Sequence, residues 1–257
     1  MLRSFALVLV ISNLFILACE KTEPKELMPV STSSDLAREL YETAIIALDS
    51  YKYGIAWDNF QQALKEDPDF FMANFWMYFV SSNEAKKIAE RIFQSDPPLN
   101  EAEKQIKTAL KYLLEGQDEK TVAHLQKAIE LYPYDPQLYK ILYMIQLQFM
   151  NDSEGSIKTI EKAINACPDF PMAYNLLGYA LMDQDKYDQA EKAFDQYIRL
   201  APNQANPYDS KGDYFMEIKE YEKAYESYME AVGIDSSFTM SKKKAEKAKL
   251  ILQEEIR

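Results

Sequence analysis

The sequence predicts an all-α protein built from stacked helix pairs, and two observations lead to this fold class. Glycine is scarce, with 6 residues in 257, whereas the helix-forming residues alanine, leucine, lysine and glutamate are plentiful. A pattern of small, large apolar, alanine and proline positions also recurs at intervals close to 34 residues, which indicates repeated units that stack on one another. Because 47% of the residues are hydrophobic, the chain can bury a continuous core.

The first 18 residues have the pattern of a secretion signal. Arg3 precedes an apolar run of roughly 14 residues, which is shorter than the stretch of about 20 residues that crosses a bilayer. Ile-Leu-Ala-Cys at 16–19 resembles the lipobox of bacterial lipoproteins, although Leu17 is larger than the residue usual at its place. This resemblance implies cleavage before Cys19 and a diacylglycerol on its sulfur. An ordinary cleaved signal followed by a chance cysteine is the alternative.

The lipobox resemblance predicts a lipid-anchored protein of the bacterial cell envelope. Glu20 follows Cys19, whereas an aspartate at that position retains enterobacterial lipoproteins at the inner membrane. We therefore place the outer membrane ahead of the inner one, and leave open the face on which the protein lies.

Residues 19–34 are predicted to form a flexible tether between the anchor and the folded part. They are polar, contain two prolines and lack an apolar period. Fully extended, such a segment reaches roughly 50 Å. Ser33 or Ser34 is expected to cap a helix that begins at Asp35, and the folded part is expected to occupy 35–257.

The repeat is clearest in the last third of the chain. Gly178 recurs as Gly212 and Ala190 as Ala224, in each case after 34 residues. Together with Phe194 these positions resemble the tetratricopeptide repeat (TPR), which implies a right-handed superhelical solenoid of about six helix pairs. The expected units lie near 37–70, 71–101, 102–135, 136–170, 171–204 and 205–238, with 239–257 as a C-terminal capping helix.

The second unit, 71–101, is degenerate. Its first helix is apolar on every side from Phe71 to Phe79, and its second is cut short by Pro97 and Pro98. The apolar helix is predicted to be buried. The alternative is that part of this aromatic run lines a ligand groove.

The residues that catalysis or metal binding would need are missing from the sequence. There is a single histidine, His124, which is interpreted as structural, and no phosphate-loop, dinucleotide-binding or zinc-protease motif occurs. Once Cys19 is lipidated, Cys167 is the only thiol, so no disulfide can form within the chain. We therefore expect a protein that is not an enzyme and has no catalytic residue, metal or cofactor.

The net charge of −12 disfavours nucleic acid as a partner. Five lysines between 242 and 249 form the one lysine-rich stretch and are interpreted as a solvated face of the capping helix. Contact with a membrane is expected through the lipid anchor only.

The TPR resemblance implies that the first helix of each pair lines a concave groove. The predicted partner-binding residues on this face are Lys140, Met144, Met172, Asn175, Tyr179, Met182, Asp209, Asp213 and Met216. The groove would grade from apolar to acidic and would suit a protein or peptide with a basic or amphipathic segment. The alternative is that these positions are merely solvated or packed between repeats.

These features predict a lipid-anchored scaffold for protein–protein interaction. The alternative is an envelope lipoprotein that binds a glycan, small ligand or peptide on tyrosine and tryptophan surfaces, and a detached sensor half of a bacterial regulator ranks last. Exposed rings at Trp57 and Trp76 would favour the ligand alternative, whereas buried rings would favour the scaffold.

Overall fold

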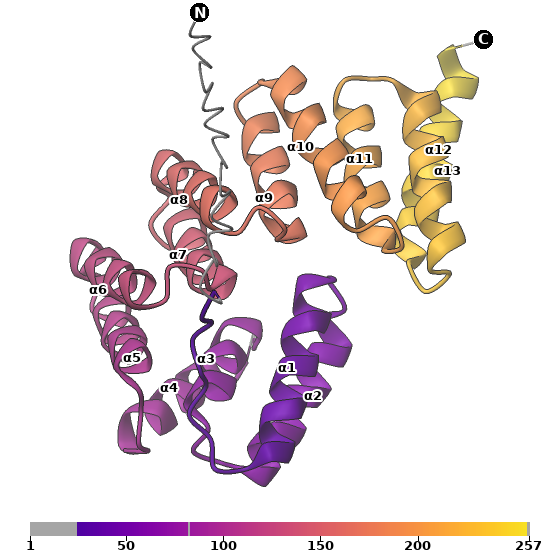
Figure 1. The fold of residues 1–257 in the computed structure, drawn as a ribbon. Coiled ribbons are helices and arrows are strands. Elements are labelled where there is room, and N and C mark those ends of the chain that lie inside the picture. Colours follow the sequence, from indigo (N-terminus) through magenta and orange to yellow (C-terminus); the bar gives the residue numbers. More distant parts are fainter. Residues whose placement is uncertain (1–24, 82, 256–257) are drawn as a thin grey trace, which may run out of the picture.

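The computed structural model describes residues 25–81 and 83–255, and within these ranges it holds thirteen helices and no strand (Figure 1). Twelve of the helices form six antiparallel pairs, and the last packs on the sixth pair. The pairs are α1 (Asp35–Asp49) with α2 (Tyr53–Glu66), α3 (Phe71–Val80) with α4 (Ala85–Gln94), α5 (Glu101–Leu114) with α6 (Asp118–Leu131), α7 (Pro136–Gln148) with α8 (Ser153–Ala166), α9 (Pro171–Met182) with α10 (Tyr187–Leu200) and α11 (Ala205–Glu217) with α12 (Tyr221–Ile234), followed by α13 (Thr239–Glu255).

The repeated glycines leave room for an aromatic ring between the two helices of a pair. A Cβ added to Gly178 would lie 2.6 Å from ring carbons of Phe194, and one added to Gly212 would lie 2.5 Å from the ring of Tyr228. Any larger residue would therefore overlap the ring that fills the space between the helices. The 34-residue spacing of these glycines thus reflects one packing arrangement used twice.

The degenerate second unit is short, and its first helix is deeply buried. Its helices α3 and α4 span 10 residues each, compared with 14 in α5 and α6. Every residue from Phe71 to Met77 is buried, as the apolar pattern predicted. Trp76, Phe79 and Val80 of the same helix line a pocket, so part of this run also faces a cavity.

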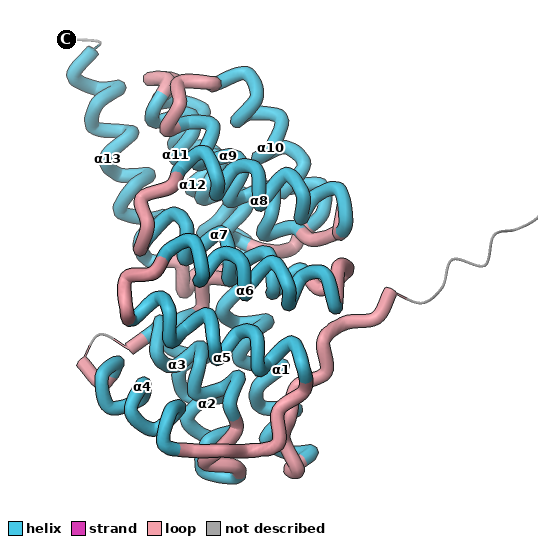
Figure 2. The backbone as a smooth tube through the Cα atoms, turned by 90° about the vertical axis from the view of Figure 1, so that its left-hand side faces the viewer, coloured by secondary structure: helices cyan, strands magenta, loops and turns pink. Residues whose placement is uncertain are grey.

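Residues 25–34, the N-terminal strap, lie along the solenoid instead of hanging free (Figure 2). The backbone N–H of Met28 donates to Asp135 at 2.9 Å, and that of Ser31 donates to Glu103 at 2.8 Å. Burial raises the pKa of both carboxyl groups, although the strap's hydrogen bonds oppose this shift. The prediction of a flexible tether is therefore wrong for the strap, because buried carboxylates hold its backbone.

Side chains of the solenoid also hold the strap's carbonyl groups. Asn100 donates to the carbonyl of Pro29 at 2.6 Å, and Arg38 donates to those of Val30 and Thr32 at 3.1 Å each. The strap leads into α1, where the hydroxyl of Ser34 accepts a hydrogen bond from the N–H of Ala37. The predicted cap is thus present at the second of the two candidate serines.

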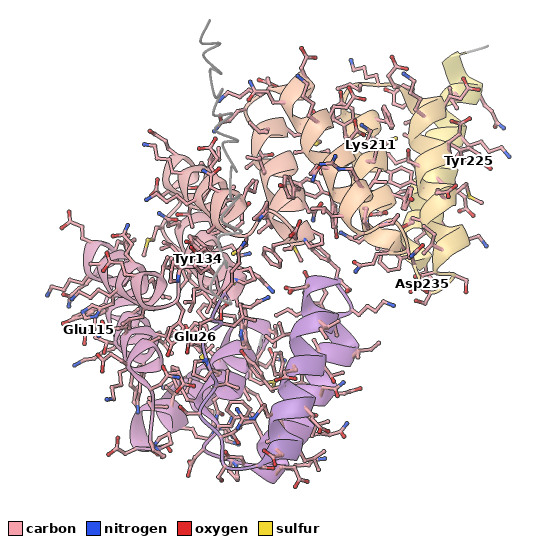
Figure 3. The ribbon with its side chains drawn as sticks, in the orientation of Figure 1. Glu26, Glu115, Tyr134, Lys211, Tyr225 and Asp235 are labelled. Carbon is pink, nitrogen blue, oxygen red and sulfur yellow. The ribbon has the colours of Figure 1, made fainter. Side chains whose placement is uncertain are left out.

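The array curves until its two ends meet. In Figure 1 the turn between α1 and α2 lies beneath α9 and α11, and Lys52 in this turn pairs with Asp235 after α12 at 3.0 Å. Figure 3 labels Asp235 at the end of α12 that faces the first pair. The superhelix is consequently closed by contacts between its first and last pairs.

Candidate functional site: the inner pocket

The concave side of the array holds an apolar pocket of about 580 Å³, here called the inner pocket. It draws side chains from the first, second, fourth and fifth helix pairs, so it exists only because the array curves. Most of its lining is aromatic or aliphatic. The lining residues are Leu48, Tyr51, Tyr53, Gly54, Trp57, Trp76, Phe79, Val80, Lys140, Tyr143, Met144, Gln148, Met172 and Leu176.

Tyr51 enters the pocket from a backbone position that an aromatic residue rarely occupies. Its φ of +57° is in the left-handed region, which costs an L-residue roughly 1–2 kcal/mol. The equivalent turns of later units contain Gly116, Asn151, Asp185 and Lys219 at similar φ values, and of these residue types glycine, asparagine and aspartate tolerate this region better. Tyr51 is thus the one aromatic residue among the described turns that have this conformation.

Two contacts with the fifth pair fix the Tyr51 side chain. Its hydroxyl accepts a hydrogen bond from Asn175 Nδ2 at 2.7 Å and lies 3.5 Å from the sulfur of Met172. Asn175 is fully buried, and its Oδ1 has no hydrogen-bond partner among the described residues. Burial raises the pKa of Tyr51 far above its ordinary value, so the hydroxyl stays protonated. The first and fifth pairs are therefore joined directly across the concave side.

A buried lysine lies at the polar end of the pocket. Lys140 Nζ is 4.8 Å from the ring centre of Trp76 and forms an ion pair with Asp49, to which Gln137 also donates at 2.7 Å. Burial lowers the pKa of Lys140, whereas Asp49 acts in the opposite direction. The lysine was predicted to face a partner, but its charge is already matched inside the protein.

The predicted acidic end of the groove is covered by α13. Lys244 reaches Asp209 and Asp213 at 2.8 Å each, and Ser241 donates to Asp209 at 2.6 Å. Burial lowers the pKa of Lys244, but its hydrogen bonds to the two aspartates more than offset this, so the net shift is upward. The aspartates are therefore not free to bind a basic segment, and Lys244 is not part of a solvated face.

Tyrosines complete this cluster of charges. Tyr179 donates to Asp213 at 2.8 Å, and Tyr228 donates to the same carboxylate at 2.7 Å. Burial and the aspartate's charge raise the pKa of both phenols. Asp213 thus accepts hydrogen bonds from two neighbouring repeats as well as from the capping helix, which makes it a structural junction.

The remaining predicted residues divide between the inner pocket and the repeat packing. Lys140, Met144 and Met172 line the pocket. Asn175 lies behind it and holds Tyr51, while Met182 and Met216 pack against smaller apolar clusters near the C-terminal pairs. Tyr51 was not predicted as a pocket residue, although an aromatic residue in a turn otherwise occupied by glycine, asparagine, aspartate and lysine is a signal that a repeat alignment would reveal.

Other candidate groups lie outside the pocket. His124 stacks on Tyr112 and shares a hydrogen bond with Gln105 at 2.7 Å, in keeping with a structural role. Cys167 contacts the carbonyl of Tyr134, and burial raises the pKa of its thiol. Residues 25–81 and 83–255 contain no cluster of side chains suited to holding a metal ion and no helix long and apolar enough to span a bilayer. Cys19 and the signal segment precede the described residues.

Comparison with known proteins agrees with this architecture. Residues 171–204 and 205–238 each match a family model of the tetratricopeptide repeat. No curated protein sequence matches the chain. A thermophilic TPR protein of Thermus thermophilus has a similar structure, with a TM-score of 0.52, 13% sequence identity and coverage of 83% of this chain and 99% of that one.

Two further solved structures are similar at lower TM-scores. A crystal structure of MamA gives a TM-score of 0.45 at 16% identity, covering 80% of this chain and 94% of that chain. The APC/C hetero-tetramer Cut9–Hcn1 gives 0.49 at 19% identity, covering 82% of this chain and 42% of that chain.

The chain therefore has the fold of a TPR solenoid, and its fifth and sixth pairs match the repeat itself. Its six pairs, one of them degenerate, and its C-terminal capping helix confirm the fold class predicted from the sequence. TPR arrays generally serve as scaffolds for protein–protein interaction and generally have no catalytic activity.

Proposed function

We propose that this chain is a lipid-anchored, non-enzymatic scaffold of the bacterial cell envelope that binds a segment of another protein in its inner pocket. The inner pocket is the observation that carries the proposal. Its volume of about 580 Å³ is within the range of 300–1,000 Å³ typical of ligand sites, and its lining is apolar apart from a few polar groups. It has room for several apolar side chains from one face of an amphipathic helix.

The charged residues on the predicted binding face restrict the kind of segment that a partner could present. Lys140 is paired with Asp49, and the aspartates of the eleventh helix are paired with Lys244. The Lys140–Asp49 pair is neutral, and the carboxylates of Asp209 and Asp213 are engaged by Lys244 and by hydroxyl groups of the protein. The apolar face of an amphipathic segment is therefore a better match than its basic residues.

The envelope location is supported by the pattern of residues 1–19, with a basic tip, a short apolar run and Cys19 at its end. Glu20 favours the outer membrane over the inner one. Mass determination of the mature protein would test the anchor directly. Diacylglycerol on an N-terminal Cys19 is the expected result, and an unmodified cysteine would show that the signal is an ordinary one.

A crosslinking experiment tests the pocket. A photoreactive amino acid at Phe79 in the full-length chain should capture a specific protein in the cells that produce it. Met144→Lys places an ammonium group in the pocket and should abolish the crosslink, whereas Met229→Lys on the outer face of α12 should leave it unchanged. Equal capture by both variants would show that the pocket does not bind the partner.

The glycan or small-ligand alternative is favoured by one observation. Both tryptophans of the chain line the inner pocket. Trp76 is only 1% exposed and Trp57 is half-buried, which by the criterion of ring exposure favours the scaffold. Intrinsic tryptophan fluorescence therefore reports on this pocket alone. A saturable change on titration with cell-wall glycan fragments would support the alternative, and no change would leave the scaffold.

A further inference from the structure

The N-terminal strap contacts the repeats with a regular spacing of three residues. Ser31 binds at the start of α5, Met28 at the start of α7, and Lys25 donates to the carbonyl of Ala166 at the end of α8 at 3.3 Å. Three extended residues span about 10 Å, close to the distance between packed helices. The strap therefore follows one edge of the solenoid, which is formed by the turns between successive pairs.

Docking of the strap shortens the connection to a lipid anchor. This step depends on the proposed lipidation of Cys19. From position 19 to position 25 there are six steps of at most about 3.6 Å, or roughly 20 Å in all. A free tether as far as α1 would reach roughly 50 Å. Because the strap is held at Lys25, the edge beside α6 and α8 is the part of the solenoid closest to the anchor.

The side chains at this edge suit the surface of a bilayer. Leu27 is 58% exposed, and Leu131 and Tyr134 at the end of α6 are also exposed. Lys25 lies 5.3 Å from the centre of the Tyr134 ring. Figure 3 labels Glu26 of the strap and Tyr134, with Glu115 at the opposite end of the α5–α6 pair. Tyrosine, leucine and lysine together are typical of side chains at the interface between water and lipid.

The charge of the chain selects the kind of lipid. Glu26 and Asp169 are exposed at the same edge, and the whole chain has a net charge of −12. Anionic headgroups would be repelled by this charge, whereas zwitterionic headgroups would not. We propose that the docked strap orients the anchored solenoid so that the edge formed by Lys25, Leu27, Leu131 and Tyr134 rests on a zwitterionic bilayer.

Fluorescence quenching on the full lipidated chain tests this orientation. In a Cys167→Ser background, Glu130→Cys puts a fluorophore at the proposed membrane edge, and Glu115→Cys puts one at the other end of the same helix pair. Both glutamates lie at the surface, and the 14 residues of α6 separate them by about 20 Å. In phosphatidylcholine vesicles containing lipids with spin-labelled headgroups, quenching at position 130 should be at least threefold stronger than at position 115.

A longer connection provides the second measurement. About twelve glycine and serine residues inserted between Pro24 and Lys25 leave the anchor and the strap intact but let the solenoid move away from the bilayer. Quenching at position 130 should then fall by at least half. Equal quenching at both positions, stronger quenching at position 115, or no effect of the insertion would overturn the proposed orientation.

Vesicle flotation separates the two proposals. A chain that floats with vesicles but shows equal quenching retains the anchor and refutes the orientation. A chain that does not float refutes the anchor and, with it, the orientation that depends on the anchor.

Discussion

Replacing Tyr51 by phenylalanine should destabilise the protein, because it removes one hydroxyl that joins the first and fifth pairs. The ring and the backbone conformation are kept, so the substitution removes only the hydrogen bond from Asn175 at 2.7 Å and the hydroxyl's weaker contact with the Met172 sulfur at 3.5 Å. Asn175 is fully buried, and its Oδ1 already has no partner among the described residues, so its amide would lose its side-chain hydrogen bond. A buried polar group left unsatisfied costs about 1–3 kcal/mol. We expect a loss of about 2 kcal/mol, or roughly 4–8 °C in Tm for a chain of this size.

Tyr53→Phe is the matched control. Tyr53 is two residues away and 56% exposed, so removal of its hydroxyl should change the free energy of unfolding by less than about 0.5 kcal/mol. Asn175→Leu in the Tyr51→Phe background should recover most of the loss, because removing both polar partners is far less costly than removing one. Thermal melts followed by circular dichroism would measure all four proteins.

Two results would refute this reasoning. If Tyr51→Phe and Tyr53→Phe melt together, the hydrogen bond between the two pairs contributes no stability. If Asn175→Leu adds its own loss to that of Tyr51→Phe, the two side chains are not energetically coupled.

Three further predictions concern the packing and the charges. Gly178→Ala places a methyl group 2.6 Å from the ring of Phe194 and should lower the free energy of unfolding in urea by about 1–3 kcal/mol. Gly233→Ala meets nothing within 4 Å and should raise it by up to about 1 kcal/mol, because alanine favours the helix α12. Lys244→Met should lower the urea midpoint by an amount equivalent to about 1–3 kcal/mol, because it leaves the carboxylates of Asp209 and Asp213 without their cation. The urea midpoint of the control variant Lys243→Met should hardly change. Hydrogen bonds from Ser237 and the ion pair with Lys52 lower the pKa of Asp235 to about 2 from 3.8, so its stabilising effect is complete above pH 4 and is lost as the pH falls toward 2. Tm measured between pH 2 and 6 should show this loss in the native chain and not in Asp235→Asn.

The helix pairs could be predicted from the sequence because each depends on residues close together in the chain. Gly178 and Phe194 are 16 positions apart and recur as Gly212 and Tyr228, so a local comparison finds both members of the contact. The serine cap of α1 is equally local, since the Ser34 hydroxyl binds the N–H three residues on.

The strap could not be predicted, because its main contacts use backbone groups that every sequence offers. Asp135 and Glu103 also accept hydrogen bonds at the starts of their own helices, so in the sequence they resemble ordinary helix-capping residues. A polar, proline-containing segment was therefore expected to be free, and the buried Met28 and the partly buried Val30 were the apolar anchors available as a signal.

The inner pocket was predicted only in part, because its walls depend on the curvature of the whole array. Lys140, Met144 and Met172 followed from the usual inward face of the first helices. Tyr51 did not, since the turn that bears it reaches the fifth pair only after the small rotations between successive pairs have accumulated. The pairing of Lys244 with aspartates more than thirty residues earlier was missed for another reason, because it depends on how the capping helix packs on the sixth pair.

Closure of the solenoid constrains how the gene for such a protein can change. Open repeat arrays tolerate duplication or deletion of a unit, since each repeat contacts only its neighbours. Here Lys52 meets Asp235 and Tyr51 meets Asn175, so the turn of the first pair must find partners at a fixed distance along the array. An inserted or deleted 34-residue unit would carry those partners out of reach and open the inner pocket. The number of repeats is thus fixed by the contacts that close the array. In-frame repeat insertions should be far less tolerated than substitutions on the outer face.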